Sequence, residues 1–206
     1  MTFLITNRTL IFLIYLIRAI REISVPFLHG VLFADKFLSI TKGSRMTDLI
    51  LACDFGGTKL SAAVVETAVL TQQNPQWHNH QRRFSQPGAT AQTDIATMIE
   101  IGRDLLAGER PSAVGISFGG PVDYTTGVVR LSHHVPGWEK LPLQDQFEEA
   151  FQAPARVDND ANVAALGEWR FGAGHGVDDM LYVTVSTGVG GGWILDGRPY
   201  HGASSM

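Results

Sequence analysis

A short segment near residue 50 joins an apolar run to an acidic residue and two adjacent glycines, a combination that can bind a nucleotide phosphate. Residues 49–53 predict a strand, Asp54 stands at its end, and Gly56 and Gly57 turn the chain into a second strand. Glycine has no Cβ, so backbone N–H groups can approach phosphate oxygens, and a carboxylate is a suitable ligand for Mg²⁺. An ordinary hairpin turn accounts for the same residues, so this segment taken alone leaves both interpretations open.

A second glycine-rich segment lies between two apolar runs near the end of the sequence. Residues 181–186 predict a strand, a loop over residues 187–192 follows, and a strand resumes at Trp193. A Rossmann fingerprint or a Walker A loop opens a helix after its glycines, and the pattern G-x-x-x-x-G-K-[ST] does not occur in the sequence. The order of strand, glycine loop and strand therefore argues against both of those nucleotide folds.

Residues 157–168 lie between the two glycine segments and combine a strand end, an Asn-Asp pair and several alanines. Asn159 can cap a helix, which would place Asp160 in the first turn of that helix. A helix N-terminus keeps a carboxylate ionised, and an ionised carboxylate can accept a proton from a hydroxyl group. Asp160 is therefore a candidate general base, although a polar helix cap is the commoner role for such a pair.

Five motifs in this order resemble the ROK (repressor, open reading frame, kinase) family: D-x-G-G-T-K, G-I-S-F-G-G-P-V-D, V-P-G-W, D-N-D-A-N-V-A-A-L-G-E and S-T-G-V-G-G-G. The resemblance runs from about Leu49 to the last residue. It implies an α/β fold with a ribonuclease-H-like lobe of the actin/hexokinase superfamily, a mixed sheet and an incomplete second lobe. It also implies an ATP-dependent kinase for a hexose or an N-acylhexosamine, of the glucokinase type, or a sugar-responsive repressor that carries the same domain.

The resemblance also implies roles for single residues, with ATP phosphates and Mg²⁺ bound between the two glycine segments. Asp54 is the implied metal ligand, and the implied nucleotide-binding residues are Asp54, Gly56, Gly57, Thr58, Lys59, Thr187, Gly188, Gly190, Gly191 and Gly192. Gly120, Asn159 and Asp160 would meet the sugar, and Asp160 would be the catalytic base. His133 and His134 replace a Pro-Asn pair of many family members, so His134 is either a sugar contact or a loop histidine.

Composition and charge fit an enzyme domain in a reducing cytoplasm. The 206 residues are 45% hydrophobic and 17% charged, enough for one sizeable core. Cys53 is the single cysteine, so it excludes a disulfide framework, and its place in the first strand predicts a buried apolar side chain. Residues 46–206 carry ten Lys or Arg against eighteen Asp or Glu, which argues against a nucleic-acid-binding surface.

Residues 1–45 form a basic and apolar extension, which we interpret as lying upstream of the true start at Met46. Its apolar run over residues 10–17 is shorter than the ~20 residues that span a bilayer, so no stable membrane insertion is expected. A signal-peptide core is disfavoured by Arg18 and Arg21 directly after the run, and a helix-turn-helix by Pro26 and the glycines.

The predicted organisation after the extension is one lobe over residues 46–175 and the beginning of a second lobe over residues 176–206. Strands are expected at 48–54, 60–67, 76–84 and 113–118, and helices at 92–107, from about 143, and after Asn159. A hairpin is expected at 124–127. The sequence ends where family members continue into an Ala-Gly-Glu-x-Gly-His segment, so this chain is expected to be inactive alone, and its full-length relatives to be homo-oligomeric.

Overall fold

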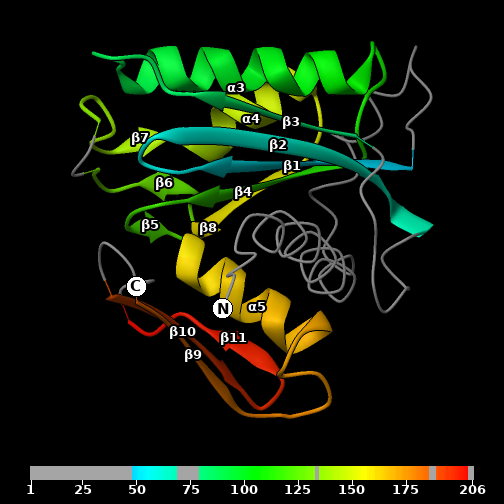
Figure 1. Cartoon of the computed structure of the whole chain (residues 1–206), viewed down its shortest axis with the longest axis vertical. Coiled ribbons are helices and arrows are strands. Elements are labelled where there is room, and N and C mark those ends of the chain that lie inside the picture. The colour runs from blue at the N-terminus through cyan, green and yellow to red at the C-terminus, as the bar shows by residue number, and fades with distance from the viewer. Residues whose placement is uncertain (1–47, 69–78, 133–134, 186–188, 204–206) are drawn as a thin grey trace, which may run out of the picture.

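The computed structural model describes residues 48–68, 79–132, 135–185 and 189–203. Its largest element is a five-stranded mixed sheet with the strand order β3-β2-β1-β4-β8 (Figure 1). Strands β1, β2 and β3 pair antiparallel, whereas β4 and β8 run parallel to β1. The five strands are β1 (Leu49–Phe55), β2 (Lys59–Glu66), β3 (Asn79–Phe84), β4 (Ala113–Phe118) and β8 (Ala155–Asn159). The predicted strands are confirmed to within one residue, except that the expected beginning of β3 lies outside the described residues.

Helices α3 (Ala91–Leu106) and α4 (Leu143–Phe151) cover one face of this sheet (Figure 1). Helix α3 begins where the Thr90 side chain accepts a hydrogen bond from the Thr93 N–H, and it ends at Ala107 in a left-handed conformation. Both helices bury one apolar side against the sheet, as amphipathic helices do. The helix predicted over 92–107 and the helix predicted from about 143 are therefore confirmed.

An aromatic cluster in this core lies directly beside the ends of β1 and β4. The Phe55 ring lies 5.4 Å from that of Trp138 and 5.9 Å from that of Phe147, and the Phe118 ring lies 4.7 Å from that of Trp138. Since Phe55 precedes Gly56 and Phe118 precedes Gly119, buried rings anchor the chain directly before both glycine turns. The core thereby fixes the position of the turns that the sequence marks as functional.

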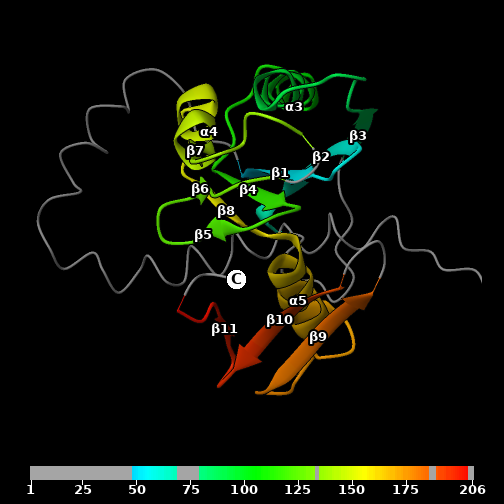
Figure 2. The same cartoon turned by 90° about the vertical axis from the view of Figure 1, so that its left-hand side faces the viewer.

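A small hairpin sheet and a second, larger sheet complete the described structure. The hairpin sheet consists of β5 (Val122–Asp123), β6 (Val128–Val129) and β7 (Leu141–Pro142), which confirms the hairpin predicted at 124–127. The second sheet has the order β11-β10-β9. Helix α5 (Asp160–Phe171) lies between the five-stranded sheet and the second sheet (Figure 2). The strands of the second sheet are β9 (Met180–Val185), β10 (Val189–Leu195) and β11 (Arg198–Tyr200).

The expected glycine loop over residues 187–192 is wrong in its second half, because β10 already begins at Val189. Gly190 pairs with Thr184 and Gly192 with Tyr182 in an antiparallel ladder. A Cβ on Gly192 would lie 2.6 Å from the Ala165 Cβ and 2.8 Å from the Ala161 carbonyl oxygen. These glycines therefore let β10 approach α5 closely, which is a packing role that the sequence did not reveal.

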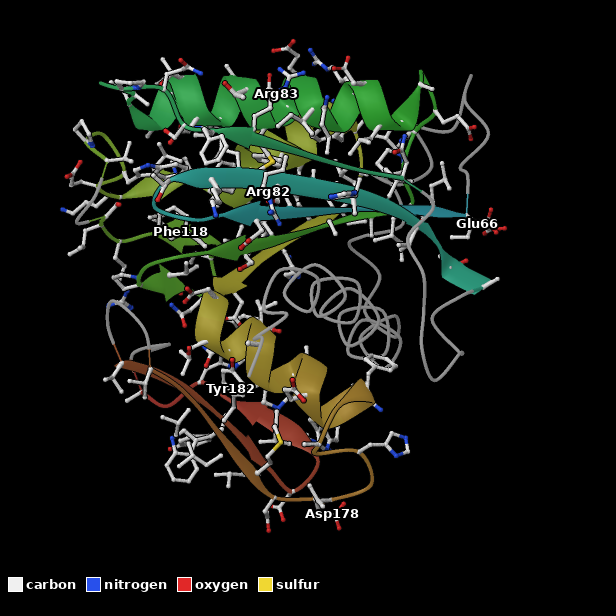
Figure 3. The ribbon with its side chains drawn as sticks, viewed as in Figure 1. Glu66, Arg82, Arg83, Phe118, Asp178 and Tyr182 are labelled. Atoms are coloured by element: carbon white, nitrogen blue, oxygen red, sulfur yellow. The ribbon has the colours of Figure 1, made fainter. Side chains whose placement is uncertain are left out.

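The face of the second sheet away from α5 exposes large apolar side chains. Alternate residues of β9 and β10 point to this face, and its exposed members are Leu181, Val183, Val185, Val189, Trp193 and Leu195. Tyr182, labelled in Figure 3, belongs to the other set of β9 residues and pairs with Gly192 on the side of α5. Among the described helices, none is long and apolar enough to cross a membrane.

Candidate active site

A row of polar side chains crosses the five-stranded sheet on the face opposite α3 and α4. Directly paired residues of neighbouring strands project from the same face of a sheet. Asp54 pairs with Ser61 on β2 and with Ser117 on β4, Ser61 pairs with Arg82 on β3, and Ser117 pairs with Asp158 on β8. Each strand thus contributes one polar residue to a line that passes through Asp54 and faces α5.

Arg82 and Arg83 illustrate how the alternation of β3 divides neighbouring cations between the two faces. Arg82 Nε donates to Ser61 Oγ at 3.1 Å on the face of the polar row. The Arg83 guanidinium pairs with Glu100 and Asp104 of α3 at 3.0 and 3.1 Å on the other face. Figure 3 shows Arg83 beside α3 and Arg82 at the level of the sheet. Of the two, Arg82 is therefore the one that can act on the charge of Asp54.

Burial raises the pKa of the Asp54 carboxyl from its ordinary value of 3.8 to about 6. Loss of hydration is the largest cause, and the negative charge of Asp160 raises the pKa further, whereas Ser117 and Arg82 lower it. The Ser117 hydroxyl is buried and makes no hydrogen bond of standard geometry within the described residues, so its contact with Asp54 is a weak one. Two carboxylates close enough to repel each other favour a cation between them.

Three backbone turns meet beside these carboxylates. The Gly56 N–H donates to the Lys59 carbonyl oxygen at 3.0 Å, and the Gly119 N–H donates to the Phe55 carbonyl oxygen at 3.0 Å. A Cβ placed on Gly119 would lie 3.8 Å from Asp160 Oδ2 and 3.9 Å from the Gly56 Cα. The turn after β1, the turn after β4 and the start of α5 therefore lie close together, although Gly56 and Asp160 are 104 residues apart in sequence.

Asp160 occupies the first turn of α5, as the sequence predicted. Asn159 caps the helix, with its Oδ1 accepting from the Ala161 N–H at 2.9 Å, and Asn159 Nδ2 donates to the Gly120 carbonyl oxygen at 3.0 Å. Asp160 Oδ1 also accepts from the Ala161 N–H, at 2.9 Å. The Asp160 side chain has exposed surface, yet the surrounding protein removes enough water to raise its pKa, and these hydrogen bonds oppose the rise.

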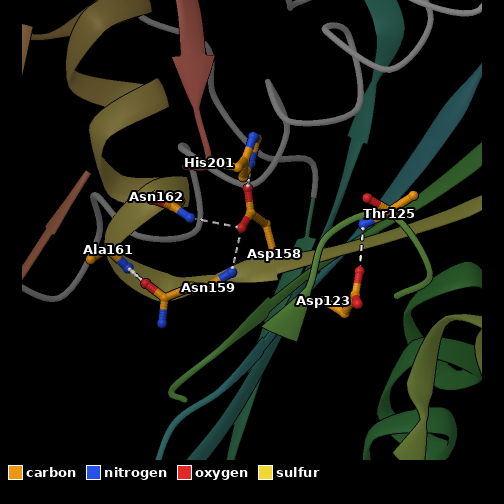
Figure 4. A network of polar contacts seen from close by, with 7 residues as sticks. All are labelled: Asp123, Thr125, Asp158, Asn159, Ala161, Asn162 and His201. Atoms are coloured by element: carbon orange, nitrogen blue, oxygen red, sulfur yellow. Dashed lines mark hydrogen bonds and ion pairs between the residues drawn. The ribbon is translucent and has the colours of Figure 1, made fainter. Parts of the chain in front are cut away.

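Asp158 is buried directly before this turn, and three donors surround its carboxylate (Figure 4). Its Oδ1 accepts from the Asn159 N–H at 2.7 Å and from Asn162 Nδ2 at 3.0 Å. His201 Nε2 lies 2.7 Å from Asp158 Oδ2, and we assign the donor role to Nε2 because a carboxylate can only accept. The His201 ring is stacked on Tyr124 with 3.8 Å between the ring centroids.

A small pocket opens beside the first glycine turn and contains a second buried carboxyl group. Gly56, Gly57, Gly119, Ser132 and Trp138 are among its lining residues, together with Asp94 of α3. Asp94 Oδ1 accepts from Ser85 Oγ at 2.7 Å; burial raises the pKa of Asp94, and this hydrogen bond lowers it. The pocket joins the proposed phosphate turn to the V-P-G-W segment.

The structure brings together most of the residues that the sequence marked for the first half of the site. Asp54, Gly56, Gly57, Gly120, Asn159 and Asp160 lie around the meeting point of the three turns. Thr58 and Lys59 are exposed at the first turn, and Lys59 Nζ lies 5.8 Å from the centre of the Phe84 ring. The predictions for Thr187, Gly188 and His134 lie outside the described residues.

The sequence did not single out Ser61, Arg82, Ser117, Asp158 or Asp94. A signal exists for Ser61, Ser117 and Asp158, because each interrupts or ends an apolar strand run. Arg82 lies in a strand of mostly polar residues, so the local sequence does not distinguish it. Only the register, however, aligns these positions. Cys53 is buried and burial raises the pKa of its thiol, which confirms the predicted apolar role.

The residues at this edge also fit the metal that the sequence resemblance implied. Mg²⁺ is usually held by one or two carboxylates together with substrate phosphates and water. Asp54 provides a half-buried carboxylate at the end of β1, and Asp160 is close enough to raise its pKa. The donor set therefore suits a divalent cation that arrives with a phosphate ligand.

A mixed α/β sheet with a glycine turn after its first strand and a carboxylate at the start of a crossing helix defines a ribonuclease-H-like lobe. The sequence model of the ROK family matches residues 50–206, so the chain belongs to this family. Two solved structures resemble it closely. A ROK hexokinase from Thermus thermophilus has a TM-score of 0.64 at 33% identity, over 76% of this chain and 50% of that one. A ROK family glucokinase from Streptomyces griseus, in complex with glucose and AMPPNP, has a TM-score of 0.66 at 33% identity, over 77% and 48%. The α/β fold class of the actin/hexokinase superfamily is thereby confirmed.

Two curated relatives point to different branches of the family. A glucokinase from Halalkalibacterium halodurans is 37% identical over 158 residues, which cover 74% of this chain and 46% of the relative. A xylose repressor from Caldicellulosiruptor bescii is 35% identical over 93 residues, which cover 45% and 23%. The chain thus spans about half the length of the glucokinase relative, and its match to the repressor covers about a quarter of that protein.

Proposed function

We propose that this chain carries the phosphate-binding turn, the metal ligand and the catalytic base of an ATP-dependent sugar kinase. The observation that carries this proposal is the meeting of three turns beside two carboxylates, where a Cβ placed on Gly119 would lie 3.8 Å from Asp160 Oδ2. The substrate is a hexose or an N-acylhexosamine. The structure of the Streptomyces griseus relative contains glucose and AMPPNP, which supports a hexose as the sugar substrate and ATP as the phosphoryl donor.

Asp160 accepts the proton of the attacking sugar hydroxyl in this proposal. Its pKa is raised by burial, which makes its carboxylate a better proton acceptor than one in water. Asn159 orients Asp160, because it caps α5 and donates to the Gly120 carbonyl oxygen. Oxygen of the sugar then bonds to the terminal phosphorus of ATP, the bond to the bridging oxygen breaks, and ADP leaves.

The first glycine turn and Asp54 bind the phosphates. The N–H groups of the turn approach the phosphate oxygens without a Cβ in the way. Mg²⁺, when bound, neutralises the charge of the phosphates, and Asp54 is the residue that would hold it. Asp54 and Asp160 then have distinct tasks, since Asp54 would hold the metal and Asp160 would accept the proton of the sugar hydroxyl.

The test is a chimera in which this chain is followed by the carboxyl-terminal half of the Halalkalibacterium halodurans glucokinase. We expect sugar-dependent ADP release from the chimera, and Asp160→Asn should lower kcat by about 10²-fold to 10⁴-fold while changing sugar binding much less. Asp178→Asn, at an exposed position before β9, is the matched control. Near-normal turnover of the Asp160→Asn chimera would refute Asp160 as the base.

A sugar-sensing regulator is the second candidate, and the match to the xylose repressor favours it. A regulator needs sugar binding without phosphoryl transfer. A chimera that binds glucose but releases no ADP with any hexose or N-acetylhexosamine would support this alternative, and turnover would exclude it.

A further inference from the structure

The His201 side chain connects the second sheet to the turn that contains the proposed base. His201 follows β11, whereas Asp158 belongs to the five-stranded sheet and Tyr124 to the turn between β5 and β6. The 2.7 Å contact with Asp158, drawn in Figure 4, and the stacking on Tyr124 therefore connect three separate parts of the fold at one imidazole. The exposed fractions of the two side chains, 17% for His201 and 2% for Asp158, show that little water reaches the contact.

Asp158 connects His201 to the start of α5 through hydrogen bonds. Its second oxygen, Oδ1, accepts from the Asn159 N–H and from Asn162 Nδ2, so both oxygens of the carboxylate are engaged. Asn159 in turn accepts from the Ala161 N–H and donates to Gly120. A rotation of the Asp158 carboxylate would therefore disturb the whole turn in which Asp160 lies.

We propose that His201 is a positioning residue: it orients Asp158, and Asp158 fixes the Asn159–Asp160 turn relative to Gly120. The identity of Asp160 as the base rests on the proposed function, but the orientation of the turn does not. The ring holds the turn in two ways, through its hydrogen bond to Asp158 and through its stacking on Tyr124. Of these two contacts, the hydrogen bond to Asp158 is the one that fixes the orientation of the Asn159–Asp160 turn.

Two substitutions separate the hydrogen bond from the stacking. His201→Phe keeps a ring that can stack on Tyr124 but has no N–H donor. His201→Gln has no ring but places an amide N–H at a similar reach from the backbone. His175, exposed in the turn after α5, supplies the control variant His175→Phe.

Hydrogen exchange followed by NMR on the unmodified 206-residue chain and its variants measures the order of the turn without ATP, sugar or turnover. Loss of a hydrogen bond to a charged group should raise the exchange rates of the Asn159 and Ala161 amides about tenfold or more in His201→Phe. His201→Gln should restore most of the protection, His175→Phe should change nothing, and the amide of Val64 in β2 should exchange equally in all of them. Because no step uses catalysis, failure of the kinase proposal leaves this readout intact.

Unchanged exchange at Asn159 and Ala161 in a folded His201→Phe chain would overturn the inference, as would equal acceleration in the Phe and Gln variants. A second measurement needs no variant, in case His201→Phe does not fold. The His201 Nε2 proton of the unaltered chain should exchange slowly and lie close to protons of the Tyr124 ring. An Nε2 proton that exchanges freely with water would also overturn the inference.

Discussion

Replacing Asp54 with Asn should make the protein more stable at neutral pH while it removes the proposed metal ligand. The pKa of the Asp54 carboxyl is about 6 in the folded chain against an ordinary value of 3.8, mainly because of burial. Below pH 3.8 the group is protonated in both the folded and the unfolded chain. As the pH rises through the window between these two values, the unfolded chain loses its proton first, so the free energy of unfolding decreases.

The size of this decrease follows from the two pKa values. At about 1.4 kcal/mol per pKa unit, ionised Asp54 lowers the free energy of unfolding by at most about 3 kcal/mol above pH 7. This is an upper limit because Asp54 retains some exposed surface, so water screens part of its charge. Asn has nearly the same shape and no charge to bury, so the Asp54→Asn chain lacks this contribution.

Urea denaturation between pH 4 and pH 8, followed by tryptophan fluorescence, to which the buried Trp138 contributes, measures the effect. Asp94 and Asp160 also have raised pKa values, so the wild-type curve alone contains several contributions. The difference between the Asp54→Asn and wild-type chains isolates Asp54. It should grow in favour of the variant by up to about 3 kcal/mol as the pH rises from 4 to 7.5. A difference that does not change with pH would refute the burial argument.

Three further outcomes are expected. Gly192→Ala should lower the free energy of unfolding by about 1 to 3 kcal/mol in urea, since its Cβ would lie 2.6 Å from that of Ala165, whereas Gly190→Ala, with its nearest contacts at 3.3 Å, should cost less. Gly57→Val in the chimera should raise the KM for ATP far more than the KM for sugar, and equal increases would indicate misfolding instead. The 206-residue chain alone should show no sugar-dependent ADP release in a coupled assay, because phosphoryl transfer needs both substrates held in line. It should also self-associate in sedimentation through its exposed apolar sheet face.

The elements that the sequence predicted well are those whose own residues specify them. The run before Asp54 is continuously apolar and the glycines after it have no competing role, so β1, its turn and β2 follow from local pattern. Helix α3 follows from the apolar spacing of Ile95, Met98 and Leu106 on one side. The start of α5 follows from the capping chemistry of Asn159, which the hydrogen bond to the Ala161 N–H confirms.

The features that the sequence did not predict depend on register and on contacts between distant segments. Ser61, Ser117 and Asp158 form one polar row only because the strands pair at those positions. The contact between Asp158 and His201 joins residues 43 apart in sequence, and no local pattern indicates it. Asp94 likewise reads as an ordinary residue of the first turn of α3 until the fold buries it beside the glycine turn.

The glycines of β10 have a packing role that does not depend on the nucleotide-binding role proposed for them. Gly190 and Gly192 face α5, and the contacts that a Cβ would make there explain why glycine is needed without any ligand. Strand β9 pairs with one edge of β10 along its length, but on the other edge β11 pairs only with Trp193, Ile194 and Leu195. Within the described residues, the backbone N–H groups on that edge of residues 189–192 therefore have no strand partner. Phosphate binding by this segment would use that free edge, so substitution at Gly191, which faces away from α5, should disturb the nucleotide with less damage to the packing than substitution at Gly192.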